Sequence, residues 1–233
     1  SGERRYQEFL SAFGLDMVRE CTKEIFRQAE ASDRAFVKSI PDGVYSAEGY
    51  MDSDGSDEEP VKIAVEVTIR DTEMHLDLSG SSLQRKGCTN CGIAQTISAA
   101  QLAYKFIVNP EQTPNGGNFR ALSVTAPEGT IFAAQEPAAC DFYASPSGLM
   151  IELTLKALSE AIVGRIPAGG PHDQMNFIVA GRDENGTLFI TGEASAVGWG
   201  ALPDADGPNA TVCYMAGDLK NLPAEVEEAK FPL

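Results

Sequence analysis

The chain has 233 residues, with 34 acidic against 18 basic side chains and a net charge of −16. This charge argues against nucleic acid or an anionic membrane surface as a partner, because both require clustered Lys and Arg. No run of about 18 apolar residues is present, so no segment is expected to span a membrane. The five cysteines are scattered and odd in number, which does not fit a disulfide-stapled secreted domain. We therefore expect a cytoplasmic protein.

The chain begins with a segment that is predicted to be helical from Tyr6 to about Val37. From Phe9 to Ile25, apolar side chains recur every four positions, and charged residues occupy the other face. Pro41-Asp42-Gly43 ends the helical pattern. Residues 1–40 are thus expected to form an N-terminal helical segment, and residues 41–233 an α+β core.

Strand patterns follow the helical segment. Residues 44–51 read as one strand, and residues 61–70 alternate strictly between apolar and polar side chains. A turn at residues 70–73 leads into the next short strand, so residues 61–79 predict a hairpin.

A loop of small residues, 79–92, leads from this hairpin into the next helix. Its Cys88-Thr89-Asn90-Cys91 is the only closely spaced cysteine pair. A strand, a small-residue loop and a helix N-terminus often form a binding site, because the free N–H groups of the first turn favour negative charge. The predicted inner face of the helix consists of Ile93, Ile97, Ala100, Tyr104 and Ile107.

A second core helix is predicted from Ser147 to about Val163. Ser145 is the expected N-cap, and Pro146 is expected at the first helical position. The helix is apolar nearly all round, which predicts burial on most sides or half-coverage by a partner chain.

The remaining segments are mostly short strands and turns. Residues 122–126 predict a strand, as do residues 176–180 and 187–193, which an Asn185-Gly186 turn joins. A strand near residues 211–215 and a short acidic helix from Pro223 complete the chain. The order of elements predicts an α+β fold with largely antiparallel or mixed sheets packed against several long helices.

Three polar clusters resemble metal sites, and each has a simpler interpretation. The cysteine pair at 88 and 91 lacks the second pair that zinc needs, so two small residues before a helix are expected. The acidic run 52–59 has its glycine at the wrong place for a calcium loop, which favours a solvated hairpin loop. His75 shares a strand face with Glu73 and Asp77, and that face is expected to be on the solvent side. We therefore predict no metal site in this chain.

His172 is the strongest candidate for direct chemistry. It lies in a small-residue loop, 168–176, that leads into a predicted strand. A polar cluster in such a loop could line a cleft and provide a general base. No nucleophile elbow, phosphate-binding lysine loop or dinucleotide fingerprint is present.

Several motifs, in this order, resemble the middle portion of the hydantoinase B family, which includes the B-type half of 5-oxoprolinase, N-methylhydantoinase, caprolactamase and subunits of acetone and acetophenone carboxylases. No single motif is specific to the family. The occurrence of all these motifs in the family's order across residues 40–233 is specific. They are Leu78-Ser79-Gly80-Ser81-Ser82, Gly87, Asn90-Cys91, Pro114-Asn115-Gly116-Gly117, Ala126-Pro127-Glu128-Gly129, Met175-Asn176, Glu193, Gly198-Trp199-Gly200-Ala201 and Asn221-Leu222-Pro223-Ala224-Glu225. The chain departs from the family at residues 140–145 and 212–218.

The resemblance implies ATP-dependent ring opening of a cyclic amide, or the related carboxylation of a ketone. An A-type partner subunit would bind ATP and phosphorylate the carbonyl oxygen of a small-molecule substrate. Metal-bound water (Mg, Mn or Zn) or bicarbonate would then react with the activated carbon. The family's metal ligands lie in an N-terminal part that this chain lacks, so ATP and the metal are expected outside this chain. The remaining parts of the B-type subunit are expected partners.

The resemblance also implies a set of residues in this chain that position substrate. The polar candidates are Asn90, Asn115, His172, Asn176 and Glu193, while Gly116 and Trp199 are expected to shape the pocket. A structural role is the alternative for each, because a buried Asn often satisfies loop backbone and a lone Trp often belongs to the core. The alternative for the whole chain is a non-catalytic assembly module whose helix 147–163 docks a partner.

Overall fold

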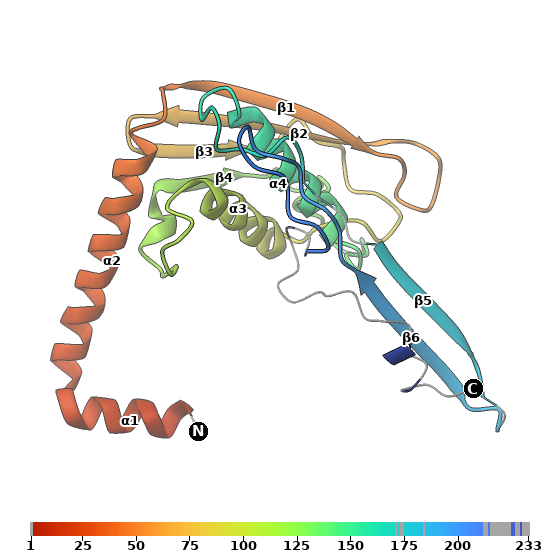
Figure 1. Cartoon of the computed structure of the whole chain (residues 1–233), viewed down its shortest axis with the longest axis horizontal. Coiled ribbons are helices and arrows are strands. Elements are labelled where there is room, and N and C mark those ends of the chain that lie inside the picture. The colour runs from red at the N-terminus through yellow and green to blue at the C-terminus, as the bar shows by residue number, and fades with distance from the viewer. Residues whose placement is uncertain are drawn as a thin grey trace.

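The computed structural model describes residues 2–170, 172, 175–183, 185–211, 214, 225, 226 and 229. Figure 1 shows a four-stranded sheet with two helices beside it, a helical arm on one side and a projecting hairpin on the other. The predicted α+β class, with mixed and antiparallel sheets, is confirmed. Within the described residues, no helix is both long enough and apolar enough to cross a membrane.

The four-stranded sheet has the order β1-β2-β3-β4. Its first three strands are antiparallel, which confirms the predicted hairpin, and β4 joins β3 in parallel. Every second residue of β2, from Val61 to Ile69, is buried, as strict alternation predicts. The bounds are β1 Gly43–Met51, β2 Val61–Arg70, β3 Glu73–Asp77 and β4 Leu122–Thr125.

Helix α4 (Ala144–Leu158) is buried nearly all round, and it packs against β1, β2 and helix α3 (Ile93–Ile107). The prediction of a helix buried on most sides is confirmed, but its predicted bounds are wrong. The helix begins at Ala144, so Pro146 lies in its first turn. The amides of the first turn have no partner within the helix, and the proline therefore costs no hydrogen bond there. Val163 lies beyond the helix and is exposed.

Helix α3 packs through small residues, and part of the predicted inner face is wrong. Ile93 and Ile97 are 49% and 41% exposed. The buried stripe instead includes Thr96, Ala99 and Ala103, together with the predicted Ala100, Tyr104 and Ile107. Small side chains allow two helix backbones to approach closely, which explains why the alanine face and not the isoleucine face is turned inward.

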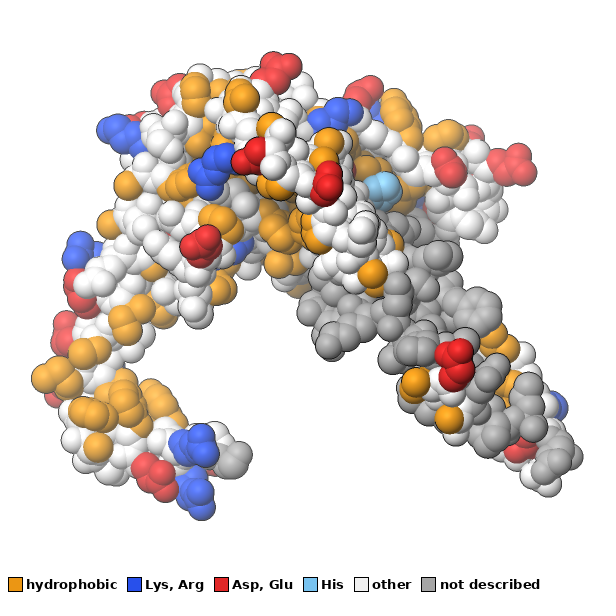
Figure 2. Space-filling model, in the orientation of Figure 1, with side chains coloured by type: hydrophobic (Ala, Val, Ile, Leu, Met, Phe, Trp, Pro, Cys, Tyr) orange, Lys and Arg blue, Asp and Glu red, His pale blue; other side chains and the backbone are white. Residues whose placement is uncertain are grey.

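The N-terminal arm consists of two helices, α1 (Gly2–Phe13) and α2 (Leu15–Val37), where the sequence pattern predicted one. Gly14 breaks the helix because its φ is 77°, a left-handed conformation that glycine adopts readily. No residue of α1 is buried, and the apolar stripe of Phe9, Phe13 and Met17 is 47%, 58% and 59% exposed. Hydrophobic side chains therefore gather openly on α1 (Figure 2).

The projecting hairpin consists of β5 (Met175–Arg182) and β6 (Leu188–Ser195), which confirms the predicted pair of strands. Gly186, in the predicted turn, has a φ of 78°. Ile178 and Ile190 are 64% and 68% exposed. Most of the predicted helix from Pro223 and most of the strand near 211–215 lie outside the described residues; residues 225, 226 and 229 are helical.

Asp33 fastens the arm to the body of the protein. Its side chain is fully buried, and its two oxygens accept hydrogen bonds from Asn109 Nδ2 at 2.8 Å and Asn118 Nδ2 at 3.1 Å. Arg120 adds an ion pair to Glu30 at 2.9 Å. Because the buried carboxylate is the acceptor for both amides, its removal leaves two donors unpaired.

We expect Asp33→Ala to lower the free energy of unfolding by about 2–4 kcal/mol, because it removes a buried acceptor from two amides. Urea unfolding at pH 7 measures the change. Glu58→Ala, at an exposed carboxylate, should change it by less than about 0.5 kcal/mol. Equal stabilities for the two variants would contradict the anchoring role.

Candidate functional site

The loop between β3 and α3 is organised by Asn90, which is fully buried. Its Oδ1 accepts the amide of Arg85 at 2.7 Å. Its Nδ2 donates to the carbonyl oxygens of Arg85, Gly87 and Ala139 at 3.0, 3.0 and 2.8 Å. Both the oxygen and the nitrogen of this side chain therefore hold loop backbone, and Asn90 positions the loop that precedes α3.

The acidic loop 52–59 is fastened to the same place through Asp54, whose side chain is fully buried. Its oxygens accept the amide and hydroxyl of Ser56 at 2.8 and 2.7 Å and the amide of Gly87 at 2.8 Å. Burial alone would raise the pKa of Asp54, but these hydrogen bonds hold that pKa well below its usual range. The guanidinium of Arg85 lies 3.6 Å away. The loop is thus a built structure and not only a solvated turn.

The cysteine pair lies beside the start of α4. Cys91 is buried, with Sγ 3.3 Å from Ser147 Oγ and 3.5 Å from the carbonyl oxygen of Tyr143. Burial raises the pKa of the Cys91 thiol to about 11, so the thiol is protonated and unreactive at neutral pH. The free cysteines within the described residues are Cys21, Cys88, Cys91 and Cys140.

Gly169, Gly170 and His172 lie along one face of α4. A Cβ on Gly148 would overlap the carbonyl oxygen of His172, so the loop backbone lies directly on the helix there. One turn later, Glu152 Oε2 accepts the amide of Gly170 at 3.1 Å. The side chain of His172 is exposed. The predicted histidine is therefore carried on a loop that touches the helix at two points.

Trp199 belongs to an aromatic cluster with Phe106 and Tyr214, which is linked to Glu152 of α4. Its ring centroid lies 4.9 Å from Tyr214 and 6.0 Å from Phe106. The hydroxyl of Tyr214 donates to Glu152 Oε2 at 2.6 Å. Burial, and secondly this hydrogen bond to a carboxylate, raise the pKa of Tyr214, which therefore stays protonated.

Asn115 and Gly116 lie elsewhere, against the N-terminal arm. Asn115 Oδ1 accepts the amide of Gly117 at 2.9 Å, which closes a local turn. A Cβ on Gly117 would overlap the backbone of Phe26 in α2, and the ring of Phe26 covers Gly116. In Figure 1 this loop lies on the side of α2, away from β5 and β6.

Asn176 and Glu193 lie on the projecting hairpin, where Asn176 pairs with Ala194 and Glu193 with Phe177. Their side chains lie outside the described part of the structure. The structure thus brings the Asn90 loop and the His172 loop to the start of α4 and places the Trp199 loop against Gly169. Asn115 and Gly116 contact the arm.

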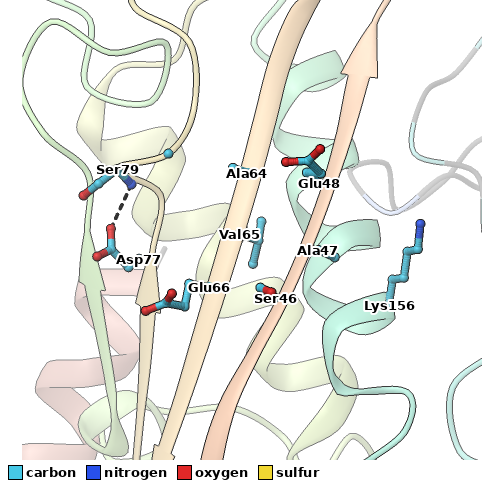
Figure 3. Close-up of a pocket in the computed structure, with 10 residues that line it drawn as sticks. Ser46, Ala47, Glu48, Ala64, Val65, Glu66, Asp77, Ser79 and Lys156 are labelled. Atoms are coloured by element: carbon cyan, nitrogen blue, oxygen red, sulfur yellow. Dashed lines mark hydrogen bonds between the residues drawn. The ribbon is translucent and has the colours of Figure 1, made fainter.

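A separate hollow of about 620 Å³ lies at the sheet and contains none of the predicted residues (Figure 3). Two of its three carboxylates have protein partners: Glu48 pairs with Lys62 at 2.7 Å, and Asp77 accepts the amide of Ser79 at 2.8 Å. His75, on the neighbouring strand, is bonded to Ser123 at 2.8 Å and not to a carboxylate. The hollow is an open, acidic surface and a weaker candidate than the loops at α4.

The described residues contain no matching set of ligands for a metal ion. No three His, Cys, Asp or Glu side chains gather closely enough there to bind a metal ion. The expectation that ATP and the metal are bound outside this chain stays a prediction.

Glu152 and Asp54 are the polar residues that the sequence interpretation missed. Glu152 is the only charged residue between Ala144 and Leu155, in a helix that is otherwise apolar. A single carboxylate in such a helix indicates an acceptor with specific donors, and Glu152 is partly buried. Asp54 gives no such signal, because it stands among other acidic residues that are exposed.

The whole chain, residues 1–233, matches the family model described as hydantoinase B/oxoprolinase. It is 30% identical to the beta subunit of the caprolactamase of Pseudomonas jessenii over 95% of this chain and 40% of that protein. It is 26% identical to the B subunit of a putative D-/L-hydantoinase of Pseudomonas sp. (strain NS671) over 100% of this chain and 40% of that protein. The chain therefore spans about 40% of the length of these curated relatives.

Two solved structures share the fold. The ATP-dependent caprolactamase from Pseudomonas jessenii matches with a TM-score of 0.85 and 30% identity, over 99% of this chain and 41% of that chain. A nucleotide-free acetone carboxylase matches with a TM-score of 0.81 and 18% identity, over 96% of this chain and 32% of that chain. At 18% identity the carboxylase shows a common fold alone.

We expect the stability of the protein to depend on the charge of Asp54. Its folded-state pKa is lowered, so its contribution is fully present above the unfolded pKa of about 4 and is lost as pH falls towards the folded value. Asp54→Asn should therefore be less stable than the parent at pH 7, and the difference should shrink between about pH 5 and pH 2. Urea unfolding across this range tests it.

The matched control is Glu58→Gln, which changes an exposed carboxylate in the same loop. Its difference from the parent should stay near zero at every pH. A difference for Asp54→Asn that is constant from pH 7 to pH 2 would show that the charge of Asp54 does not stabilise the loop.

Proposed function

The chain belongs to the hydantoinase B/oxoprolinase family, and from this premise we propose that it is part of the B-type subunit of an ATP-dependent enzyme that opens cyclic amides. The observation that carries this choice is the likeness to caprolactamase, at 30% identity and a TM-score of 0.85 over 99% of the chain. The likeness to acetone carboxylase, at 18% identity, supports only the fold, so carboxylation is the second choice.

In this proposal the chain provides a wall of the substrate site. The loop of His172 lies against α4, and Asn90 holds the adjacent loop in place. The ring of Trp199 packs on Phe106 of α3 and on Tyr214, whose hydroxyl is bonded to Glu152 of α4. His172 is an exposed imidazole on a fixed backbone, which is suited to exchanging a proton or a hydrogen bond with substrate. Asn176 and Glu193 are proposed to hold the substrate's polar groups.

Asn115 and Gly116 take a different role in the proposal. Their loop packs on Phe26 of α2, so they support the arm and do not contact substrate. ATP and a divalent metal are proposed to bind to the A-type partner and to the remaining parts of the B-type subunit, in the cytoplasm.

An assembly role is also supported by a specific observation. The arm exposes Phe9 and Phe13, and the hairpin exposes Ile178 and Ile190, so apolar side chains project at both ends of the protein. Exposed apolar surfaces of this kind mark contacts with other protein. The chain can form a wall of the substrate site and also contact other subunits. Activity measurements test the first of these roles.

The test is the full-length B-type subunit assembled with its A-type partner. We expect ring opening of a lactam, a hydantoin or 5-oxoproline that requires ATP, measured by chromatography of the amino-acid product. His172→Ala should lower kcat by about 10²-fold or more, as expected for loss of a proton-transferring group. His75→Gln is the matched control and should leave kcat unchanged, because His75 is bonded to Ser123 and Thr125 of β4.

The 233-residue chain alone should show no turnover with the same substrates. Bicarbonate-dependent consumption of a ketone, with no ring opening of any cyclic amide, would contradict the proposed reaction. Full activity of His172→Ala in the assembled enzyme would show that His172 takes no part in the reaction.

A further inference from the structure

Helix α4 presents two contact points to the loop 168–172 on one of its faces. Gly148 and Glu152 are four residues apart and therefore lie one above the other on the helix. The carbonyl oxygen of His172 occupies the space of a Gly148 side chain, and the amide of Gly170 donates to Glu152. The loop therefore runs along this face in the direction opposite to the helix.

A single oxygen of Glu152 joins three segments of the chain. Oε2 accepts the amide of Gly170 at 3.1 Å and the hydroxyl of Tyr214 at 2.6 Å. Gly170 has no room for a side chain, because the phenol of Tyr214 fills the space where a Cβ would lie. Tyr214 in turn packs against Trp199, with ring centroids 4.9 Å apart. The carboxylate thus fixes the His172 loop and the Trp199 cluster relative to α4.

We infer that Glu152 is a positioning residue of the proposed site, which holds the His172 loop against α4 through Gly170. The effect of Glu152 on catalysis rests on the proposed function. The effect of Glu152 on the position of the loop does not. A carboxylate is suited to this task because one ionised oxygen can accept two donors, and hydrogen bonds to a charged acceptor are stronger than neutral ones.

The first experiment measures the loop itself and needs no activity. Amide hydrogen exchange of the 233-residue chain is followed by mass spectrometry in the parent, Glu152→Ala and Glu152→Gln. Glu152→Ala should speed exchange at Gly170 by about tenfold or more, because a charge-assisted bond is lost. Glu152→Gln should largely restore protection, since its carbonyl oxygen can still accept the amide. The peptide of β2 (Val61–Arg70) is the internal reference and should not change.

The second experiment is a double-mutant cycle in the assembled enzyme. If Glu152 acts through His172, Glu152→Ala should lower kcat about tenfold or more in the parent and have almost no further effect in His172→Ala. A residue that merely stabilises the fold would lower kcat by the same factor in both backgrounds.

The outcomes separate the inference from the proposed function. Unchanged exchange at Gly170 in Glu152→Ala, or a kcat effect that is equal in both backgrounds, overturns the positioning role. An assembled parent enzyme without ring-opening activity overturns the proposed function alone, and faster exchange at Gly170 would still support the contact.

Discussion

The burial of α4 is the constraint on which the rest of the structure depends. An apolar helix must be covered on all sides, and here β1, β2 and α3 cover most of its surface. The remaining contacts come from loops: Cys91 at Ser147, the His172 backbone at Gly148 and Gly170 at Glu152. Because these loops cover the part of α4 that the sheet and α3 leave open, segments far apart in the sequence meet at this helix. The proposed site is a consequence of packing this helix.

Much of the fold could be predicted from the sequence, because periodicity reports local structure. The alternation in 61–70 fixed β2, and the apolar run after Ser147 predicted a buried helix. The break at Gly14 was missed because the apolar spacing continues across it. The inner face of α3 was misassigned because alanines pack more closely than isoleucines, which hydrophobicity alone does not reveal.

The candidate site could be predicted only in part. Asn90, His172 and Trp199 lie in small-residue loops whose turn chemistry is visible in the sequence. The first two loops do meet at α4, and the third contacts Gly169 in the loop of His172. Asn115 lies in a loop with the same chemistry, yet it contacts the arm, because turn chemistry gives a loop's shape and not its neighbours. Glu152 acts through tertiary contacts to Gly170 and Tyr214, which no local pattern encodes.

Photolabelling tests most directly whether substrate binds at α4. A photoreactive lactam would be irradiated in the assembled enzyme with ATP, and labelled peptides would be identified by mass spectrometry. We predict label in the peptide that carries Gly170 and His172, which contact α4, or in residues 198–202, which contact Ala168 and Gly169. No label is expected in residues 110–117, where Gly116 and Gly117 contact α2. Label in 110–117, or only on other parts of the complex, would contradict the claim that this chain forms a wall of the site.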